Sequence, residues 1–440
     1  MADEEQSAGL ESPLIPVQPQ QQHALQSTRG QFTKGELFEE LKKQLLLAGP
    51  LVSSNFLLFG MQVISVMYVG HLGELSLAGA SMATSFASVT GLSLIIGMGS
   101  ALDTFCGQSY GAKQYHMLGI HLQRAMLVLL LACIPIATIW FNAGYILQSL
   151  GQDPEIAAAA GNYARFLIPC IFAYAVQQCH SRFLQTQSNV VPMIVSTGTA
   201  TLVHLLVCWL LVYKTSLGYR GAAVAISISY WINALFLVVY IRVSPSCKHT
   251  WTGFSKEAFH GIPNFIKLSI PSAIMISLEI WSFELMVLLS GFLPNPQLET
   301  SVLSISLNTC SMIYMIPLAF AAAASTRVSN QLGAGQPRLA RLAVGVALCI
   351  VVTEGIIRGS GQQKIGAYVN LGAYYLMGIP TAILLAFVFH IGGKGLWMGI
   401  IVALFVQALS LAIIILFTDW EKEVKKASDR VYNTPTASDA

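Results

Sequence analysis

Long apolar segments dominate this sequence and restrict it to one class of fold. Eleven such runs follow one another, and most reach the roughly 20 residues that an α-helix needs to cross a bilayer. They cover residues 45–69, 77–101, 118–141, 160–180, 191–213, 221–241, 267–292, 301–324, 342–357, 365–390 and 395–418. Only 10% of the residues are charged, whereas a soluble domain carries roughly 25%. The pattern predicts an all-α, polytopic membrane protein of ten to twelve helices. It excludes a soluble enzyme, a disordered protein and a nucleic-acid binder.

One apolar run is too short to cross the bilayer squarely. Residues 342–357 number 16 and include Glu354, whereas about 20 are needed. The distribution of basic residues also argues against a crossing there. Up to residue 341, 11 Lys and Arg residues lie on the side of the N-terminus and only Lys214 and Arg220 on the other, which predicts a cytosolic N-terminus. If 342–357 does not cross, the basic C-terminal tail is cytosolic as well. We therefore expect this segment to be tilted, re-entrant or strained.

These assignments divide the chain into five parts. Residues 1–34 are polar and rich in Gln and Pro, which predicts a disordered cytosolic tail. Residues 35–243 form an N-lobe of six transmembrane helices, and 244–262 a cytosolic linker loop. Residues 263–420 form a C-lobe, and 421–440 a second cytosolic tail.

The second half of the chain repeats the first. Pro50 follows Leu-Ala-Gly and Pro271 follows Leu-Ser-Ile, 221 positions apart, and the segments 108–114 and 331–336 begin 223 positions apart. Six crossings separate the copies, so the two lobes have the same topology and are related by a pseudo-twofold axis along the membrane normal. Transporters with such repeats bind their substrates between the lobes, near the midplane.

The C-lobe is shorter than this repeat requires. Gln108 and Arg182 are 74 positions apart, whereas their counterparts Gln331 and Arg358 are only 27 apart, which leaves the C-lobe 47 residues short. About one helix with its loop is therefore missing near 357/358. The prediction becomes two pseudo-symmetric lobes with 10–11 transmembrane helices instead of 12.

Ionisable residues inside apolar runs are the first candidates for function, because each costs roughly 2.5–3.5 kcal/mol at the middle of a membrane helix. The run 267–292 contains Glu279 and Glu284, which lie about 140° apart around a helix. One of them can line a cavity while the other meets a neighbouring helix. A carboxyl group in a dry cavity exchanges a proton near neutral pH, and its charged form binds a cation. The alternative for each is a structural hydrogen bond.

Three further polar residues have more modest interpretations. Asp103, at the end of the second run, is expected to be a loop or gate carboxylate. Glu354 sits near the membrane interface if its short run does not cross, and His204 is expected to be a polar packing residue. Asn308 either faces a central cavity or bonds across helices.

Prolines inside the runs free backbone carbonyls and permit hinges. Pro50 and Pro271 match across the repeat, which favours a mechanical role over a static kink. No Ser/His/Asp, Cys/His or clustered-His arrangement lies on one helical face, so we expect neither an enzyme nor a metal site nor a cofactor.

Several motifs together resemble the multidrug and toxic compound extrusion (MATE) transporters, in their plant branch. The matching segments are 68–75, 103–112, 294–301, 327–335 and 361–370, and the resemblance extends over about 35–420. It implies a fold of twelve helices in two six-helix lobes around a V-shaped cavity. It also implies efflux of organic cations or secondary metabolites in exchange for protons or sodium. The family's carboxylate on the seventh helix matches Glu279, whereas its Asp on the tenth helix falls in the region that this chain lacks.

The leading hypothesis is a proton-coupled antiporter that exports small organic cations, xenobiotics or plant secondary metabolites by alternating access of two lobes. Its partners are the substrate, protons and the lipid bilayer of the vacuolar or the plasma membrane. The alternative is a non-transporting truncated isoform that at most modulates a full-length transporter. A receptor fits less well, since it needs seven spans and a ligand-bearing outer loop.

Overall fold

Helices form nearly all of the protein. The structure is a computed structural model that describes residues 32–350 and 353–432, and no strand occurs among these residues. Ten helices in the described part are long and apolar enough to cross a membrane. The all-α, polytopic fold with about ten spans is therefore confirmed, and the protein is an integral, multi-pass membrane protein.

The N-lobe contains six of these spans. They are α2 (Lys34–Gly70), a combined span of α3 (Glu74–Ala87), η1 (Ser88–Leu92), α4 (Ser93–Gly99) and α5 (Ala101–Gly111), then α6 (Tyr115–Phe141), α8 (Pro154–Thr186), α9 (Val191–Tyr213) and α10 (Arg220–Val243). The short helix α7 (Ala143–Ser149) lies between α6 and α8. The connection to the C-lobe carries only two short 3-10 helices, η2 (Pro245–Cys247) and η3 (Lys256–Phe259).

The C-lobe contains the other four spans. They are α11 (Ile262–Ser290), α12 (Pro296–Gly333), the irregular span of α15 (Gln363–Asn370), η4 (Leu371–Gly378), α16 (Ile379–Ile383) and η5 (Leu384–Val388), and finally α17 (Gly393–Phe417). Between α12 and α15 lie two shorter helices, α13 (Pro337–Cys349) and α14 (Thr353–Ser360). The last helix is α18 (Trp420–Tyr432).

Local sequence signals fix where several of these helices begin. Thr33 and Glu36 form a capping box at the start of α2, in which each side chain bonds to the other's backbone N–H. Asp153 accepts hydrogen bonds from two backbone N–H groups at the start of α8, which begins with Pro154. Residues 1–31, most of the expected N-terminal tail, lie outside the described residues, and Lys34 already belongs to α2.

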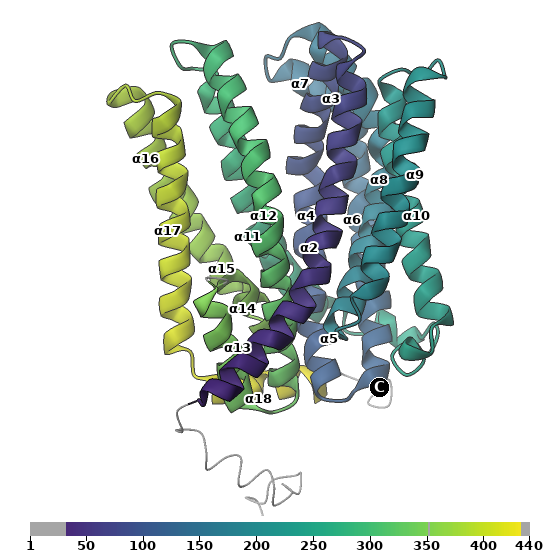
Figure 1. The fold of residues 1–440 in the computed structure, drawn as a ribbon, viewed down its shortest axis with the longest axis vertical. Coiled ribbons are helices and arrows are strands. Elements are labelled where there is room, and N and C mark those ends of the chain that lie inside the picture. The colour runs from purple at the N-terminus through teal and green to yellow at the C-terminus, as the bar shows by residue number, and fades with distance from the viewer. Residues whose placement is uncertain (1–31, 351–352, 433–440) are drawn as a thin grey trace, which may run out of the picture.

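Neither of the two helices described around 342–357 is long enough by itself to form a span. α13 has 13 residues and α14 has 8, which correspond to about 20 Å and 12 Å of helix, against a hydrocarbon core of about 30 Å. Both lie near the end of the molecule that also carries α18 and the start of α2 (Figure 1). We call this the α18 end. The positions of α13 and α14 are compatible with a re-entrant segment, which remains a prediction.

Candidate functional site

A buried carboxyl group lies at the centre of the C-lobe. Glu279 of α11 is 8% exposed, and the Tyr314 hydroxyl of α12 donates a hydrogen bond to its Oε1 at 3.3 Å. The Gln407 side chain of α17 lies close to the same carboxyl. Polar groups from two neighbouring helices therefore reduce the cost of placing a carboxylate in an apolar helix.

A chain of buried hydrogen bonds extends from this carboxyl through the lobe. The Gln407 amide donates to Asn370 Oδ1 at 2.9 Å, and the Tyr374 hydroxyl donates to Gln407 Oε1 at 3.0 Å. Asn370 in turn donates to the backbone oxygen of Met275 in α11 at 2.8 Å. Because each polar group has a partner, the network holds α11, α15, η4 and α17 in one arrangement around Glu279.

α14 adds two charged residues to this region. Glu354 and Arg358 both lie within electrostatic range of Glu279. Arg358 is only 1% exposed, and its Nε and Nη2 atoms have no hydrogen-bond partner. An arginine buried in this way needs nearby negative charge, which Glu279, Glu354 and Asp103 supply.

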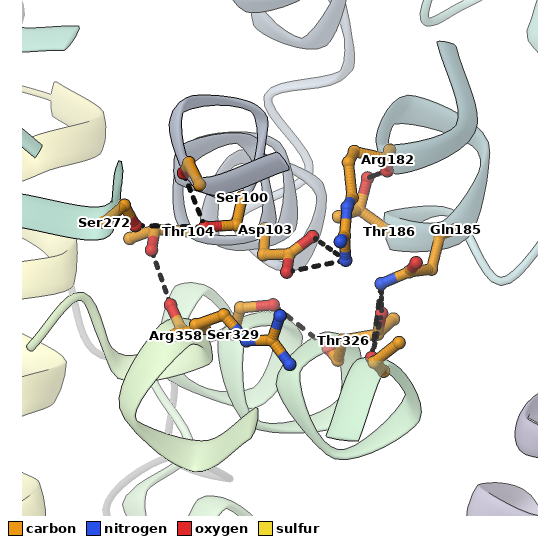
Figure 2. Close-up of polar contacts among 12 residues, drawn as sticks. Ser100, Asp103, Thr104, Arg182, Gln185, Thr186, Ser272, Thr326, Ser329 and Arg358 are labelled. Atoms are coloured by element: carbon orange, nitrogen blue, oxygen red, sulfur yellow. Dashed lines mark hydrogen bonds and ion pairs between the residues drawn. The ribbon is translucent and has the colours of Figure 1, made fainter. Parts of the chain in front are cut away.

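Asp103 forms an ion pair instead of lying in a loop. It is fully buried within α5, and Arg182 Nη1 of α8 approaches its Oδ2 at 3.1 Å and its Oδ1 at 3.4 Å. The loop interpretation of Asp103 is therefore wrong, because α5 continues to Gly111 before the chain turns. Figure 2 shows the pair facing the C-lobe, with Arg358 on the opposite side of the interface.

Hydrogen bonds join the two lobes around this ion pair (Figure 2). The hydroxyl oxygens of Ser100 and Ser272 are 3.0 Å apart, and the Thr104 hydroxyl donates to the Arg358 backbone oxygen at 2.6 Å. The Gln185 amide donates to Thr326 Oγ1 at 3.3 Å. The side chains of one lobe thus bond to the backbone and hydroxyls of the other across a buried contact.

The two repeated segments, 108–114 and 331–336, both contain glycine and contact each other in this interface. A Cβ atom at Gly111 would overlap the backbone of Asn330, and one at Gly333 would overlap the backbone of Gln108. Only glycine permits such close approach of two backbones. The repeat therefore supplies the matched surfaces through which the lobes close at the α18 end.

Ion pairs between α2 and the C-lobe strengthen the same closure. Glu40 accepts hydrogen bonds from Arg327 Nε at 2.8 Å and Nη2 at 2.7 Å, in a bidentate geometry. Glu36 pairs with Arg338 of α13 at 2.7 Å.

The lobes make fewer polar contacts toward the opposite end, where α11 and α12 diverge from α2 and α3 (Figure 1). Trp281 donates to the Val89 backbone oxygen at 2.8 Å, and Glu284 is half-buried beside the Ser85 hydroxyl of α3. Asn308 is exposed and donates to Ser304 O of its own helix at 3.0 Å. Of the two alternatives for Asn308, a bond across helices does not occur among the described residues, and a position facing a cavity remains a prediction.

The two matched prolines lie inside continuous helices, Pro50 in α2 and Pro271 in α11. Close to Pro271 the two lobes pack tightly, since a Cβ atom at Gly97 of α4 would overlap Ala273. A helix turn weakened by proline at such an interlobe contact is suited to a hinge.

His204 has the packing role expected of it. It is fully buried in the N-lobe, and both ring nitrogens are bonded, Nε2 to Ser65 Oγ at 3.0 Å and Nδ1 to Ser229 Oγ at 2.9 Å. No group of three His, Cys, Asp or Glu residues in the described part of the chain could hold a metal ion.

The sequence alone did not reveal two residues of the site. Tyr314 does not stand out in the sequence because tyrosines are common in apolar helices. The available signal is its hydroxyl group in α12, the helix that follows the one with Glu279. Arg358 was recognised only as the counterpart of Arg182. Its burial depends on how α14 folds back, which no local pattern encodes.

Comparison with known proteins identifies relatives over most of the chain. The MatE family model matches residues 50–210 and 271–357. Protein DETOXIFICATION 16 of Arabidopsis thaliana is 51% identical and aligns with 92% of this chain and 94% of its own length. Protein DETOXIFICATION 17 of the same plant is 52% identical over 89% of this chain and 93% of its own.

Solved structures give the same result. The crystal structure of the eukaryotic MATE transporter AtDTX14 superposes with a TM-score of 0.87 at 44% identity, covering 90% of this chain and all of that one. A MATE structure in the bent conformation shares the fold, with a TM-score of 0.75 at 16% identity. The alignment with DETOXIFICATION 16 extends over 456 residues, more than the 440 of this chain, so that relative has internal residues without a counterpart here.

Proposed function

The chain belongs to the MatE family of efflux transporters, and from that premise we propose that it exchanges small organic compounds for protons. The substrate class is organic cations, xenobiotics or plant secondary metabolites, and the membrane is the vacuolar or the plasma membrane. The observation that carries the proposal is the buried Glu279 carboxyl with its polar neighbours in the C-lobe.

The charges around Glu279 support competition between a proton and a cation. Glu279 and Glu354 are two carboxyl groups within electrostatic range of one guanidinium, that of Arg358. One carboxyl group therefore remains without a compensating charge. In a dry lobe it must either bind a proton or pair with a cation. Protonation at Glu279 would thus favour release of a cationic substrate, and loss of the proton would favour its binding.

The arrangement of the lobes supports alternating access. Contacts at the α18 end join the lobes around Asp103 and Arg182, while Glu284 and Asn308 lie toward the other end, where they would line the substrate cavity. Positive-inside orientation makes the α18 end cytosolic. The structure then corresponds to a state closed toward the cytosol. Pro50 and Pro271 would be the hinges for the change to a state open toward the cytosol.

Transport in proteoliposomes with an imposed pH gradient tests this proposal. We expect the wild-type chain to accumulate a fluorescent organic cation against the gradient and the variant Glu279→Gln to lose at least nine-tenths of this uptake, roughly the effect of 1.4 kcal/mol. Gln keeps the hydrogen bonds of Glu279 but cannot exchange a proton. Glu155→Gln is the matched control, because Glu155 is an exposed residue in the first turn of α8. Equal uptake by Glu279→Gln and wild type would refute the role of this carboxyl.

One observation favours a second candidate function. α13 and α14 are too short to cross, and the relatives have internal residues that this chain lacks. A protein without a complete helix pair in the C-lobe could be a non-transporting isoform that modulates a full-length relative. Inserting the corresponding segment of DETOXIFICATION 16 between Ile357 and Arg358 distinguishes the two. Transport only by the extended chain supports the isoform, whereas transport by the present chain supports the antiporter.

A further inference from the structure

The helix α18 crosses from one lobe to the other at the end where they meet. It begins after Asp419, whose carboxylate accepts hydrogen bonds from the backbone N–H groups of Lys422 and Glu421. These bonds, that to Lys422 first, lower the pKa of Asp419 below its usual value. α18 packs against α12 and α13 of the C-lobe and against α5 of the N-lobe. Figure 1 shows it lying across the base of the molecule.

The two faces of α18 differ in character. Trp420, Glu423 and Ala427 are buried against the lobes, whereas Lys422, Lys425 and Lys426 are exposed. The buried residues recur every three to four positions, which is typical of an amphipathic helix that rests on a surface. One face of α18 thus packs against the lobes. Its other face is hydrophilic, so α18 can be exposed to water after it leaves them.

Arg430 connects the lobes directly. Its Nη1 atom donates to Gln108 Oε1 of the N-lobe at 3.2 Å and to the Ser360 backbone oxygen of the C-lobe at 3.1 Å. Gln108 is the first residue of the repeated segment 108–114, and Ser360 lies two residues after Arg358, the counterpart of Arg182 in the repeat. A single cation on a third segment therefore bonds to one group of each lobe.

Gly361 provides the space for this guanidinium. Its φ of +81° favours glycine, and a Cβ atom there would lie 2.6 Å from Arg430 Nη1. The conformation of the chain after α14 thus leaves room for the arginine of α18. Two independent features, the hydrogen bonds and the glycine, fit the same position of Arg430.

We infer that α18 is a strap that holds the lobes together at the α18 end, with Arg430 as a positioning residue that must release before this end opens. The inference deepens the proposed function, since alternating access requires that end to separate. The contact is partly polar: Glu423 is buried with one oxygen bonded to Lys426 and its Oε2 without a partner. Contacts with polar groups of this kind are typical of surfaces that come apart.

Distance measurements between spin labels on the two lobes test the strap. His116 at the start of α6 and Gln336 after α12 are exposed and suit labels, and Cys310 and Cys349 are replaced by serine because the other six cysteines are buried. In Arg430→Ala, we expect the ratio of long to short interlobe distances to rise about tenfold, the effect of losing roughly 1.4 kcal/mol of charge-assisted hydrogen bonding. Arg430→Lys should give a smaller rise, since an ammonium group at the end of a flexible chain reproduces this geometry only in part.

The control is Lys425→Ala, which removes an exposed cation from the other face of the same helix. Deletion of residues 419–440 provides a second test and should match or exceed the effect of Arg430→Ala. Unchanged distances in Arg430→Ala, or an equal shift in Lys425→Ala, would overturn the inference. Uptake measured on the same samples separates the two proposals. A distance shift in a chain without uptake contradicts the antiporter but not the strap, whereas uptake with unchanged distances contradicts only the strap.

Discussion

The ion pair of Asp103 and Arg182 permits a quantitative test of how the interlobe contact is held. Its two side chains are 0% and 10% exposed, and Asp103 is also within range of Arg358 from the C-lobe. Asp103→Ala leaves the buried guanidinium of Arg182 without its partner. It also removes one of the negative charges near the buried guanidinium of Arg358. Breaking a buried pair in this way costs about 3–5 kcal/mol.

The same reasoning predicts recovery in a double variant. Asp103→Ala combined with Arg182→Leu removes both charges, so no buried ion remains unpaired between these two positions. Replacing a buried pair by apolar residues is often close to neutral, so we expect stability within about 1 kcal/mol of wild type. The difference between the sum of the single variants and the double variant is the coupling energy of the pair.

Unfolding of the purified protein in detergent micelles by titration with SDS, followed by circular dichroism, measures these free energies. Glu155→Ala is a suitable control because Glu155 is exposed. If Asp103→Ala unfolds like wild type, or if the double variant is no more stable than Asp103→Ala, then Arg182 does not depend on this carboxylate and the reasoning is refuted.

Three further outcomes follow from the interlobe contacts. Gly333→Ala introduces a Cβ atom that overlaps the backbone of the other repeat copy, so interlobe distances measured by spin labels should lengthen, whereas Gly60→Ala, which meets nothing within 4 Å, should leave them unchanged. Glu40→Gln weakens the bidentate bond to Arg327 and should destabilise the protein to SDS by about 1.5–3 kcal/mol, whereas Glu39→Gln at the exposed neighbouring position should have no effect. With ten spans, tags on the two ends of the chain should be digested together by a protease added to one side of sealed vesicles, and protection of one tag alone would contradict the re-entrant α13–α14 segment.

Much of the fold could be predicted because the membrane leaves few alternatives. A backbone in hydrocarbon must satisfy its own hydrogen bonds, so each apolar run of sufficient length becomes a helix. The run at 342–357 differs from the others, since its length and Glu354 both argue against a crossing, and this remains a prediction. The kind of helix within a span was not predictable: η4 and η5 are π-helical, and no composition signal distinguishes them from their neighbours.

Single residues of the candidate site could be predicted, but the residues that surround them could not. Glu279 was recognisable because a carboxyl group is costly in an apolar run. Its partners Tyr314 and Gln407 lie on other helices and became evident only when the helices were packed. Asp103 was expected to be a loop or gate carboxylate because it lies at the end of the second apolar run, but α5 continues to Gly111.

The sequence by itself determined that this chain is a membrane protein with about ten spans in two related lobes, and it predicts a shortened C-lobe. These properties depend on length, hydrophobicity and repetition, which are linear features of a chain. Only the tertiary structure decided that the two repeated segments contact each other, that Arg358 is buried beside Glu279 and Asp103, and that Arg430 bonds to both lobes. Such contacts join residues hundreds of positions apart, and their geometry depends on how whole helices pack rather than on any local pattern.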